Sequence, residues 1–151
     1  MPRRLLRLLP LLLLIAACDT GDVDAEPDCT GGASGSFTAT IDGAPFEAEY
    51  LTFTFTQNDL SVTGSVTADG LQQRLTIVVT DIALGSFPVG GGAAATYEET
   101  EGGETRRYTA SDGEVFILQD FPENPSGTFA FTARGGGETV TITGGVFDVY
   151  P

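Results

Sequence analysis

Carboxylates are the residues of this sequence that could do acid–base chemistry. The 151 residues include no histidine, so a Ser-His-Asp or Cys-His mechanism cannot be assembled and zinc lacks its usual nitrogen ligands. Two Asp or Glu side chains about 5 to 9 Å apart in a cleft could hydrolyse a glycoside. We interpret the local carboxylates as a solvated charge run beside a glycine-rich loop, and we expect no enzyme, no metal site and no cofactor. These carboxylates are Glu98, Glu99, Glu101, Glu104 and Glu114.

A pair of arginines marks the candidate binding site. Arg106 and Arg107 are adjacent in a strongly acidic domain and could receive an anionic group. Tyr97 and Tyr108 could offer aromatic rings to a sugar, in a chain that has no tryptophan. Long glycine-rich loops on a rigid scaffold commonly carry function, so we predict the site within residues 85–113. The alternative is structural, with each arginine paired to a glutamate across a hairpin. The glutamates available for such pairs are Glu98, Glu99 and Glu104.

The N-terminus predicts export and lipid attachment. Three arginines precede an apolar run that ends near residue 17, which is typical of a signal peptide. The run is too short for a membrane-spanning helix, which needs roughly 20 apolar residues. Ile15-Ala16-Ala17-Cys18 resembles the bacterial lipobox, in which cleavage precedes the cysteine and lipid is added to it. We predict a lipoprotein signal peptide over 1–17 and acylation of Cys18, with an ordinary signal peptidase site as the alternative.

The charge of the predicted mature chain excludes several partners. From Cys18 onward the chain has four arginines, no lysine and no histidine against all 21 acidic residues, a net charge of −17. Such a chain repels phosphate backbones, so we expect no nucleic-acid partner. It also repels anionic lipid headgroups, so the acyl chain must hold the protein to the membrane. Once Cys18 carries lipid it cannot pair with Cys29, which leaves Cys29 as a lone thiol.

An acidic segment over 18–35 follows the predicted lipid site. It combines five acidic residues with Gly, Ser and Pro, a composition that cannot bury a core, so we predict a flexible tether with a mean reach of about 25 Å. We expect a lipid anchor in the cell envelope, at the outer membrane, facing either the periplasm or the cell surface. Three interpretations stay open: Asp19 as an inner-membrane retention signal, the acidic cluster as a surface-export signal, or a solvated spacer.

Residues 36–151 alternate between apolar and polar side chains with a period of two, which indicates β-strands. The clearest hairpin runs from 60 to 80 around Asp69-Gly70, and Asp42-Gly43 is an earlier turn of the same kind. No window offers a capped, periodic helix of about ten residues. About eight to ten short strands with glycine-rich connections predict one all-β domain, an antiparallel sandwich or a barrel-like fold.

The apolar phase slips once, between Tyr50 and Leu51, which indicates a β-bulge or a bend there. Before the slip, Tyr50 belongs to the same apolar set as Phe46 and Ala48. The later and shorter strands are predicted at 86–89, 93–97, 107–110, 115–119, 128–133, 139–143 and 146–150. The large apolar residues expected in the core are Phe37, Phe46, Phe53, Phe55, Phe129, Phe131 and Phe147.

Four segments carry a resemblance that spans nearly the whole predicted domain. They are FTATIDGAPFEA (37–48), GSFPVG (85–90), GTFAFTA (127–133) and VTITGGVFDV (140–149). The chain resembles a family of small bacterial lipoproteins of unknown function that open with IDG-x-x-[FW] and close with GTFxFxA and V-x-I-x-x-G-x-F strands. Phe46 stands where many members have Trp. The resemblance implies no catalytic or binding residues.

The function predicted from the sequence is that of a lipid-anchored envelope lipoprotein whose β domain is a non-catalytic binding module. Its partners would be the membrane, through the acyl anchor, and an envelope or extracellular molecule that the sequence does not identify. The alternative is a structural accessory subunit of an envelope or surface complex that pairs through an exposed strand edge. Glycoside hydrolysis by carboxylates is the third possibility.

Overall fold

The computed structural model describes residues 29–119 and 124–150. The predicted signal peptide and the lipid site at Cys18 lie outside these residues. The described chain contains no helix, and eleven β-strands form one antiparallel sheet, which confirms the predicted all-β class. The strands are β1 (Cys29–Gly32), β2 (Ser34–Ile41), β3 (Ala44–Glu47), β4 (Tyr50–Thr56), β5 (Asp59–Ala68), β6 (Leu71–Val79), β7 (Gly85–Pro88), β8 (Ala93–Glu101), β9 (Glu104–Gln119), β10 (Ser126–Gly135) and β11 (Glu138–Tyr150).

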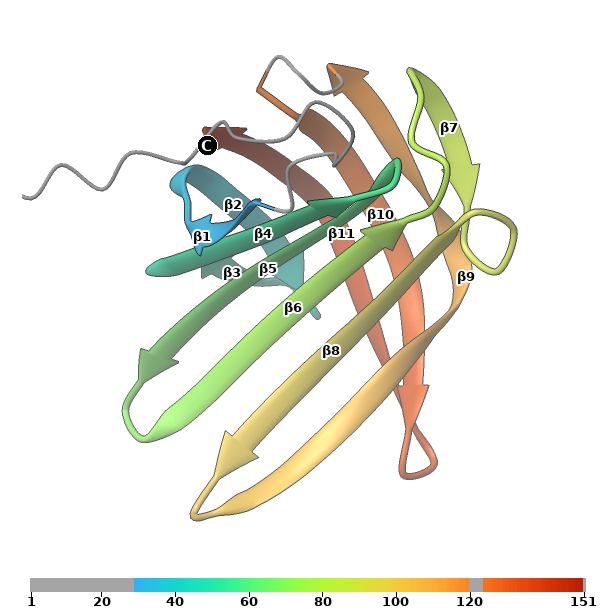
Figure 1. Cartoon of the computed structure of the whole chain (residues 1–151). Helices are drawn as coiled ribbons and strands as arrows, with labels where there is room; N and C mark the ends of the chain where they lie inside the picture. Colours follow the sequence, from blue (N-terminus) through green and yellow to red (C-terminus); the bar gives the residue numbers. More distant parts are fainter. Residues whose placement is uncertain (1–28, 120–123, 151) are drawn as a thin grey trace, which may run out of the picture.

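The sheet rolls onto itself so that its two halves form two layers (Figure 1). The strand order is β1-β4-β5-β6-β8-β9-β10-β11-β2-β3, with β7 paired to β9 beside β8. Strands β4, β5, β6 and β8 form one layer, and β2, β3, β10 and β11 lie behind it. The described end strands β1 and β3 do not pair with each other, so the sheet is not closed.

Two short crossings bring the ends of the sheet together. Only Ala33 separates β1 from β2, although the two strands lie near opposite ends of the strand order. Its backbone N–H donates to the carbonyl of Leu51 at 3.2 Å. Glu49, in the link between β3 and β4, donates its N–H to the carbonyl of Ser65 at 2.9 Å. These bonds satisfy backbone groups that the bends in the chain would otherwise leave unpaired.

Strand β1 lies within the segment that the sequence predicts as a flexible tether, residues 18–35. Its backbone pairs with β4, from Cys29 opposite Phe55 to Gly32 opposite Thr52. Main-chain hydrogen bonds can hold a strand that has no apolar side chains of its own. The composition of this segment therefore does not predict a strand. The described β structure therefore begins seven residues before position 36.

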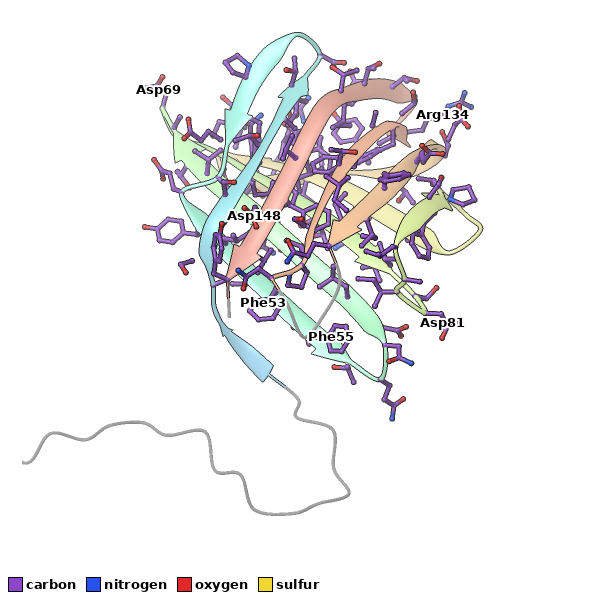
Figure 2. The ribbon with its side chains drawn as sticks, turned by 90° about the horizontal axis from the view of Figure 1, so that it is seen from above. Phe53, Phe55, Asp69, Asp81, Arg134 and Asp148 are labelled. Atoms are coloured by element: carbon purple, nitrogen blue, oxygen red, sulfur yellow. The ribbon has the colours of Figure 1, made fainter. Side chains whose placement is uncertain are left out.

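The core fills the space between the two layers (Figure 2). Six of the seven phenylalanines predicted for it are buried, and Phe55 is half-buried. Phe37 and Phe129 lie 5.2 Å apart between ring centroids. A fully buried phenylalanine contributes about 1.5 to 3 kcal/mol from apolar burial. The described buried side chains are apolar, apart from the hydroxyl groups of Tyr97 and Tyr108 at one end of the core.

Asp-Gly turns set the register of the early hairpins, as predicted. Asp42 and Gly43 have φ values of 47° and 85°, and Asp69 and Gly70 have 52° and 85°. Two consecutive residues with positive φ form the turn that matches the twist of antiparallel strands. A third such turn, Gln57-Asn58, joins β4 to β5.

The strands predicted at 86–89, 93–97 and 107–110 are present, but the glycine-rich loop expected around the glutamates between them was wrong, because β8 and β9 extend through most of it. Strands β8 and β9 form a long hairpin around Gly102-Gly103, and the glutamates expected in a loop lie on these strands. These parts of the strands lack the alternation of apolar and polar residues that predicts a strand. Paired charges on two neighbouring strands stabilise each other there in place of apolar contacts. Strand β9 also joins the two strands predicted at 107–110 and 115–119, and β11 joins those predicted at 139–143 and 146–150.

The sequence predicts that Tyr50 belongs to the same apolar set as Phe46, and this prediction was wrong. Phe46 is buried in β3, whereas Tyr50 is 68% exposed at the start of β4. The predicted bend is confirmed, but it lies at Ala48 and Glu49, where the chain leaves the pairing of β3. The alternation restarts there, which turns Tyr50 outward and Phe53 inward.

Candidate functional site

The two predicted arginines lie on opposite faces of the β8–β9 hairpin. Its register places Glu98 opposite Arg107 and Glu99 opposite Arg106, and successive side chains of a strand point to opposite faces. Arg107 pairs with Glu98, and an Nη2 atom of Arg106 lies 3.3 Å from Oε2 of Glu99. The pairing of both arginines with glutamates across a hairpin is therefore confirmed.

The two predicted tyrosines lie side by side on the inner face of the same hairpin. Tyr97 and Tyr108 are 0% and 3% exposed, and their rings stack at 5.8 Å between centroids. The hydroxyl of Tyr97 donates to Oε1 of Glu99 at 2.8 Å and accepts a bond from Nε2 of Gln73. Burial raises the pKa of Tyr97 above its ordinary value, and the bond to Glu99 raises it further.

Glu138 on β11 completes this inner cluster. It accepts a hydrogen bond from the hydroxyl of Tyr108 at 3.1 Å and lies 3.9 Å from Arg106. Burial, followed by that hydrogen bond, raises the pKa of Tyr108. Arg106 also borders a hollow of about 490 Å³ at the β10–β11 turn. The cluster closes one end of the core with groups that bind each other. Arg107 projects from the opposite face of the hairpin, and it also lines the hollow that Arg106 and Tyr108 border.

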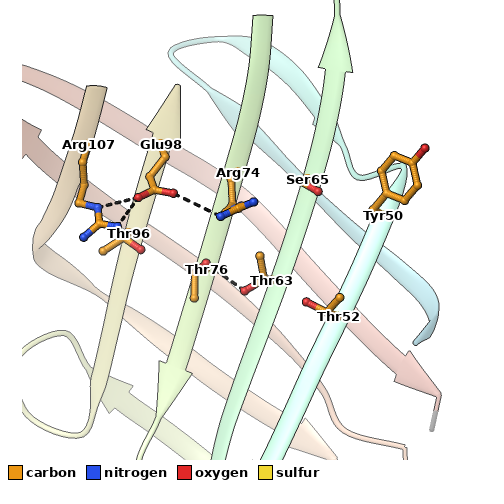
Figure 3. Close-up of a pocket in the computed structure, with 9 residues that line it drawn as sticks. All are labelled: Tyr50, Thr52, Thr63, Ser65, Arg74, Thr76, Thr96, Glu98 and Arg107. Atoms are coloured by element: carbon orange, nitrogen blue, oxygen red, sulfur yellow. Dashed lines mark hydrogen bonds and ion pairs between the residues drawn. The ribbon is translucent and has the colours of Figure 1, made fainter. Parts of the chain in front are cut away.

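The outer face of the front layer carries two rows of polar side chains in register, which we call the threonine face (Figure 3). Both rows cross β4, β5, β6, β8 and β9, because outward positions of neighbouring strands stand opposite each other. The first row is Thr52, Thr63, Thr76, Thr96 and Thr109. The second row is Tyr50, Ser65, Arg74, Glu98 and Arg107.

A hollow of about 470 Å³ lies over these rows. All members of the threonine face except Thr109 line it. A neighbouring hollow of about 270 Å³ shares Arg74 and Glu98 and continues toward the β8–β9 turn. The remaining residues that line this second hollow are Gln72, Thr100 and Thr105.

Arginine outnumbers carboxylate on this face. Glu98 is its single carboxylate and lies between Arg107, whose Nε donates at 2.6 Å, and Arg74, whose Nη1 is 3.8 Å away. The arginine side chains are 68% and 51% exposed, against 15% for Glu98. Arg134 continues the first row beside Thr109 and lies at the periphery in Figure 2. Three of the four arginines in the described residues therefore point outward from the sheet.

The threonine face is not among the sites predicted from the sequence. The alternation shows that each threonine is polar and outward, but one strand does not reveal which residues stand beside it. Two-residue turns set the register of Thr52 with Thr63 and of Thr63 with Thr76, so those pairs could have been found from the sequence. The pairing of Thr76 with Thr96 depends on the long connection 80–92 and had no local signal.

Metal binding and membrane-spanning helices have no support in the described residues. Within 29–119 and 124–150, no group of three or more His, Cys, Asp or Glu could hold a metal ion. The same residues contain no helix long and apolar enough to cross a membrane.

Comparison with known proteins identifies a family. Neither the curated proteins nor the solved structures contain a match to this chain. A family model described as a domain of unknown function, DUF6252, matches residues 33–151. The match begins between β1 and β2 and covers every later strand. The chain therefore belongs to the DUF6252 family of domains of unknown function.

Proposed function

We propose that this protein is a lipid-anchored lipoprotein of the bacterial cell envelope whose β domain is a non-catalytic binding module. In this proposal residues 1–17 are removed, Cys18 is acylated, and the acyl chain fixes the protein to the outer membrane. The net charge of −17 from Cys18 onward supports an acyl anchor, because a chain of this charge gains nothing from anionic headgroups.

The threonine face is the observation that carries the binding role. It presents hydroxyl and guanidinium groups over a hollow of about 470 Å³, on five strands paired edge to edge. Side chains on a rigid sheet keep their spacing, which lowers the cost of binding a ligand of matching spacing. Glycoside hydrolysis by a carboxylate pair would need a second carboxylate beside Glu98, and the residues lining this hollow include none.

Metabolic labelling with a palmitate analogue tests the anchor. Wild-type protein should carry the label and sediment with membranes, whereas Cys18→Ser should be unlabelled and retain its signal peptide. Cys29→Ser is the matched control, because it removes the other cysteine and should keep the label. Label on the Cys18→Ser variant would disprove the assignment. Protease treatment of intact cells, with a periplasmic protein as the leakage control, then decides which way the domain faces.

An accessory role in an envelope complex is the second candidate function. Phe116 on β9 and Val146 on β11 are 40% and 42% exposed and flank Thr128 of β10 in register. They line a hollow of about 320 Å³ on the back layer. A protein partner recovered in stoichiometric amounts from detergent-solubilised envelopes, and lost with Phe116→Ser, would favour this role. Recovery of the same partner with Phe116→Ser would count against it.

A further inference from the structure

The first row of the threonine face is a regular line of hydroxyl groups. Antiparallel strands lie about 4.8 Å apart, so five strands in register spread the row over about 19 Å. Each threonine hydroxyl can donate one hydrogen bond and accept others. Only Thr63 and Thr76 bond to each other, at 3.0 Å, among the described members of the row. The row therefore suits an extended ligand that carries hydroxyl groups along its length.

The second row adds positive charge beside these hydroxyls. Among the described residues, the single ion-pair contact of Arg74 is the one to Glu98, at 3.8 Å, beyond hydrogen-bond distance. Arg107 uses Nε and Nη2 on one oxygen of Glu98. Both guanidinium groups thus keep donors that face the hollow (Figure 3). A planar guanidinium is matched to a carboxylate, to which it can donate two parallel bonds.

Tyr50 supplies an apolar surface at the far end of the second row. Figure 3 shows its ring at the opposite end from Arg107, on β4. The side chain is 68% exposed, and its ring joins an apolar body to a polar hydroxyl. Such a ring can pack against the C–H face of a sugar while neighbouring hydroxyls bind its polar groups.

From these three features we infer that the threonine face binds a carboxylated saccharide, a chain of uronic-acid type. The sugar hydroxyls would bind along the row of threonines, one carboxylate would bind Arg74 and Arg107, and a sugar ring would pack on Tyr50. This inference rests on the proposed binding function and names its ligand class. The domain as a whole is strongly acidic, but the lining of this hollow carries two arginines against one glutamate, so a single carboxylate meets a local excess of positive charge there.

Calorimetry of the full-length lipoprotein, purified in detergent micelles, tests the inference. The probe is a linear trimer of galacturonic acid, and its methyl ester is the neutral control of the same shape. We expect the acid to bind and the ester to bind at least about tenfold more weakly, since hydrogen bonds to charged groups are the strong ones. Equal binding of acid and ester would overturn the role of the carboxylate.

Two adjacent arginines provide matched variants. Arg107→Gln and Arg74→Gln should each weaken binding of the acid at least about tenfold. Arg106→Gln changes the same residue type one position away on the opposite face, and it should leave the affinity unchanged. Thr76→Val should weaken binding of acid and ester alike, because it removes one hydroxyl of the row. Unchanged affinity in Arg74→Gln and Arg107→Gln would place the ligand elsewhere and overturn the inference.

Failure of this inference and failure of the proposed function give different results. Palmitate labelling is done on the same preparation. A labelled protein that does not bind the acid overturns the saccharide assignment and leaves the lipoprotein assignment standing. An unlabelled protein that binds the acid supports saccharide binding at the threonine face and overturns the lipid-anchor assignment. Thermal unfolding of each variant confirms that a loss of binding is not a loss of fold.

Discussion

Nε of Arg107 donates a hydrogen bond to Oε1 of Glu98 at 2.6 Å across the β8–β9 hairpin. On its other side Glu98 lies 3.8 Å from Arg74, which comes from β6. One carboxylate on β8 thus holds two arginines, one from each of the strands on its two sides, at the β9 end of the threonine face. The arrangement keeps the guanidinium groups in place, and it also leaves a negative charge beside any anion that would bind them.

Removing the charge of Glu98 should therefore strengthen binding of the uronate trimer. Glu98→Gln removes a repulsion of about 1 kcal/mol at 4 Å in water, which corresponds to about a fivefold gain in affinity by calorimetry. The free energy of unfolding should fall by about 1 kcal/mol, because both arginine partners of Glu98 are more than half exposed and ion pairs with solvated partners contribute little. Glu99→Gln, on the inner face, serves as the control and should not raise the affinity. A weaker complex with Glu98→Gln would contradict the proposed geometry.

Gly64 is a position where the two layers approach each other closely. A β-carbon at Gly64 would lie 2.8 Å from Cδ1 of Phe37 and 2.9 Å from Cβ of Ala48. Gly64→Ala should destabilise the protein by about 1 to 3 kcal/mol, the usual cost of overpacking a core. Urea unfolding followed by circular dichroism measures it. The neighbouring Ser65 points outward, so Ser65→Ala should change the free energy of unfolding by less than about 0.5 kcal/mol. Equal effects of the two variants would contradict the layer packing.

Phe147 and Phe116 allow a direct comparison of buried and exposed phenylalanine. Phe147 is 0% exposed and Phe116 is 40% exposed. Phe147→Ala should lower the free energy of unfolding by about 3 to 5 kcal/mol, because it removes apolar contacts and leaves a cavity. Phe116→Ala should cost much less. The measurement is again urea unfolding, and a similar cost for both variants would show that the back layer is not packed as described.

The inner tyrosines predict a loss of stability at alkaline pH. The folded state raises the pKa of Tyr97 and Tyr108 above their ordinary value near 10. A raised pKa means that the unfolded chain releases these protons first, so the stabilisation is full below about pH 10 and declines as pH rises beyond it. Urea unfolding between pH 8 and 11 should show this decline.

Tyr97→Phe separates the titration of Tyr97 from other alkaline effects. The variant removes the hydroxyl that bonds to Glu99 and Gln73, so it should lose about 1 kcal/mol at pH 8. Its stability should then depend less on pH above 10 than that of the wild type. Tyr50→Phe, at an exposed position, is the control and should keep the wild-type dependence. Identical pH dependence in Tyr97→Phe and wild type would contradict the assignment.

Most of the fold could be predicted from the sequence, and the errors have identifiable physical causes. Strands with an apolar face were found, since burial leaves an alternation in the sequence. The polar ends of β8 and β9 resemble a loop in the sequence because Glu98 and Arg107 pair with each other across the hairpin and need no apolar neighbours. Strand β1 had no signal because its pairing with β4 is made by the main chain. The predicted inward direction of the Tyr50 side chain is wrong because the chain changes its pairing partner at Ala48 and Glu49.

The all-β class, the phenylalanine core and the Asp-Gly turns follow from the sequence alone, because these depend on residues near one another in the chain. The alternation also places the threonines on the polar side of their strands. The pairing of β6 with β8, which puts Arg74 beside Glu98, is set by the three-dimensional fold. A two-residue turn sets the register of its two strands directly, whereas the long connection 80–92 allows many registers. Packing of the shared core selects one of them, and this selection aligns the two halves of the threonine face.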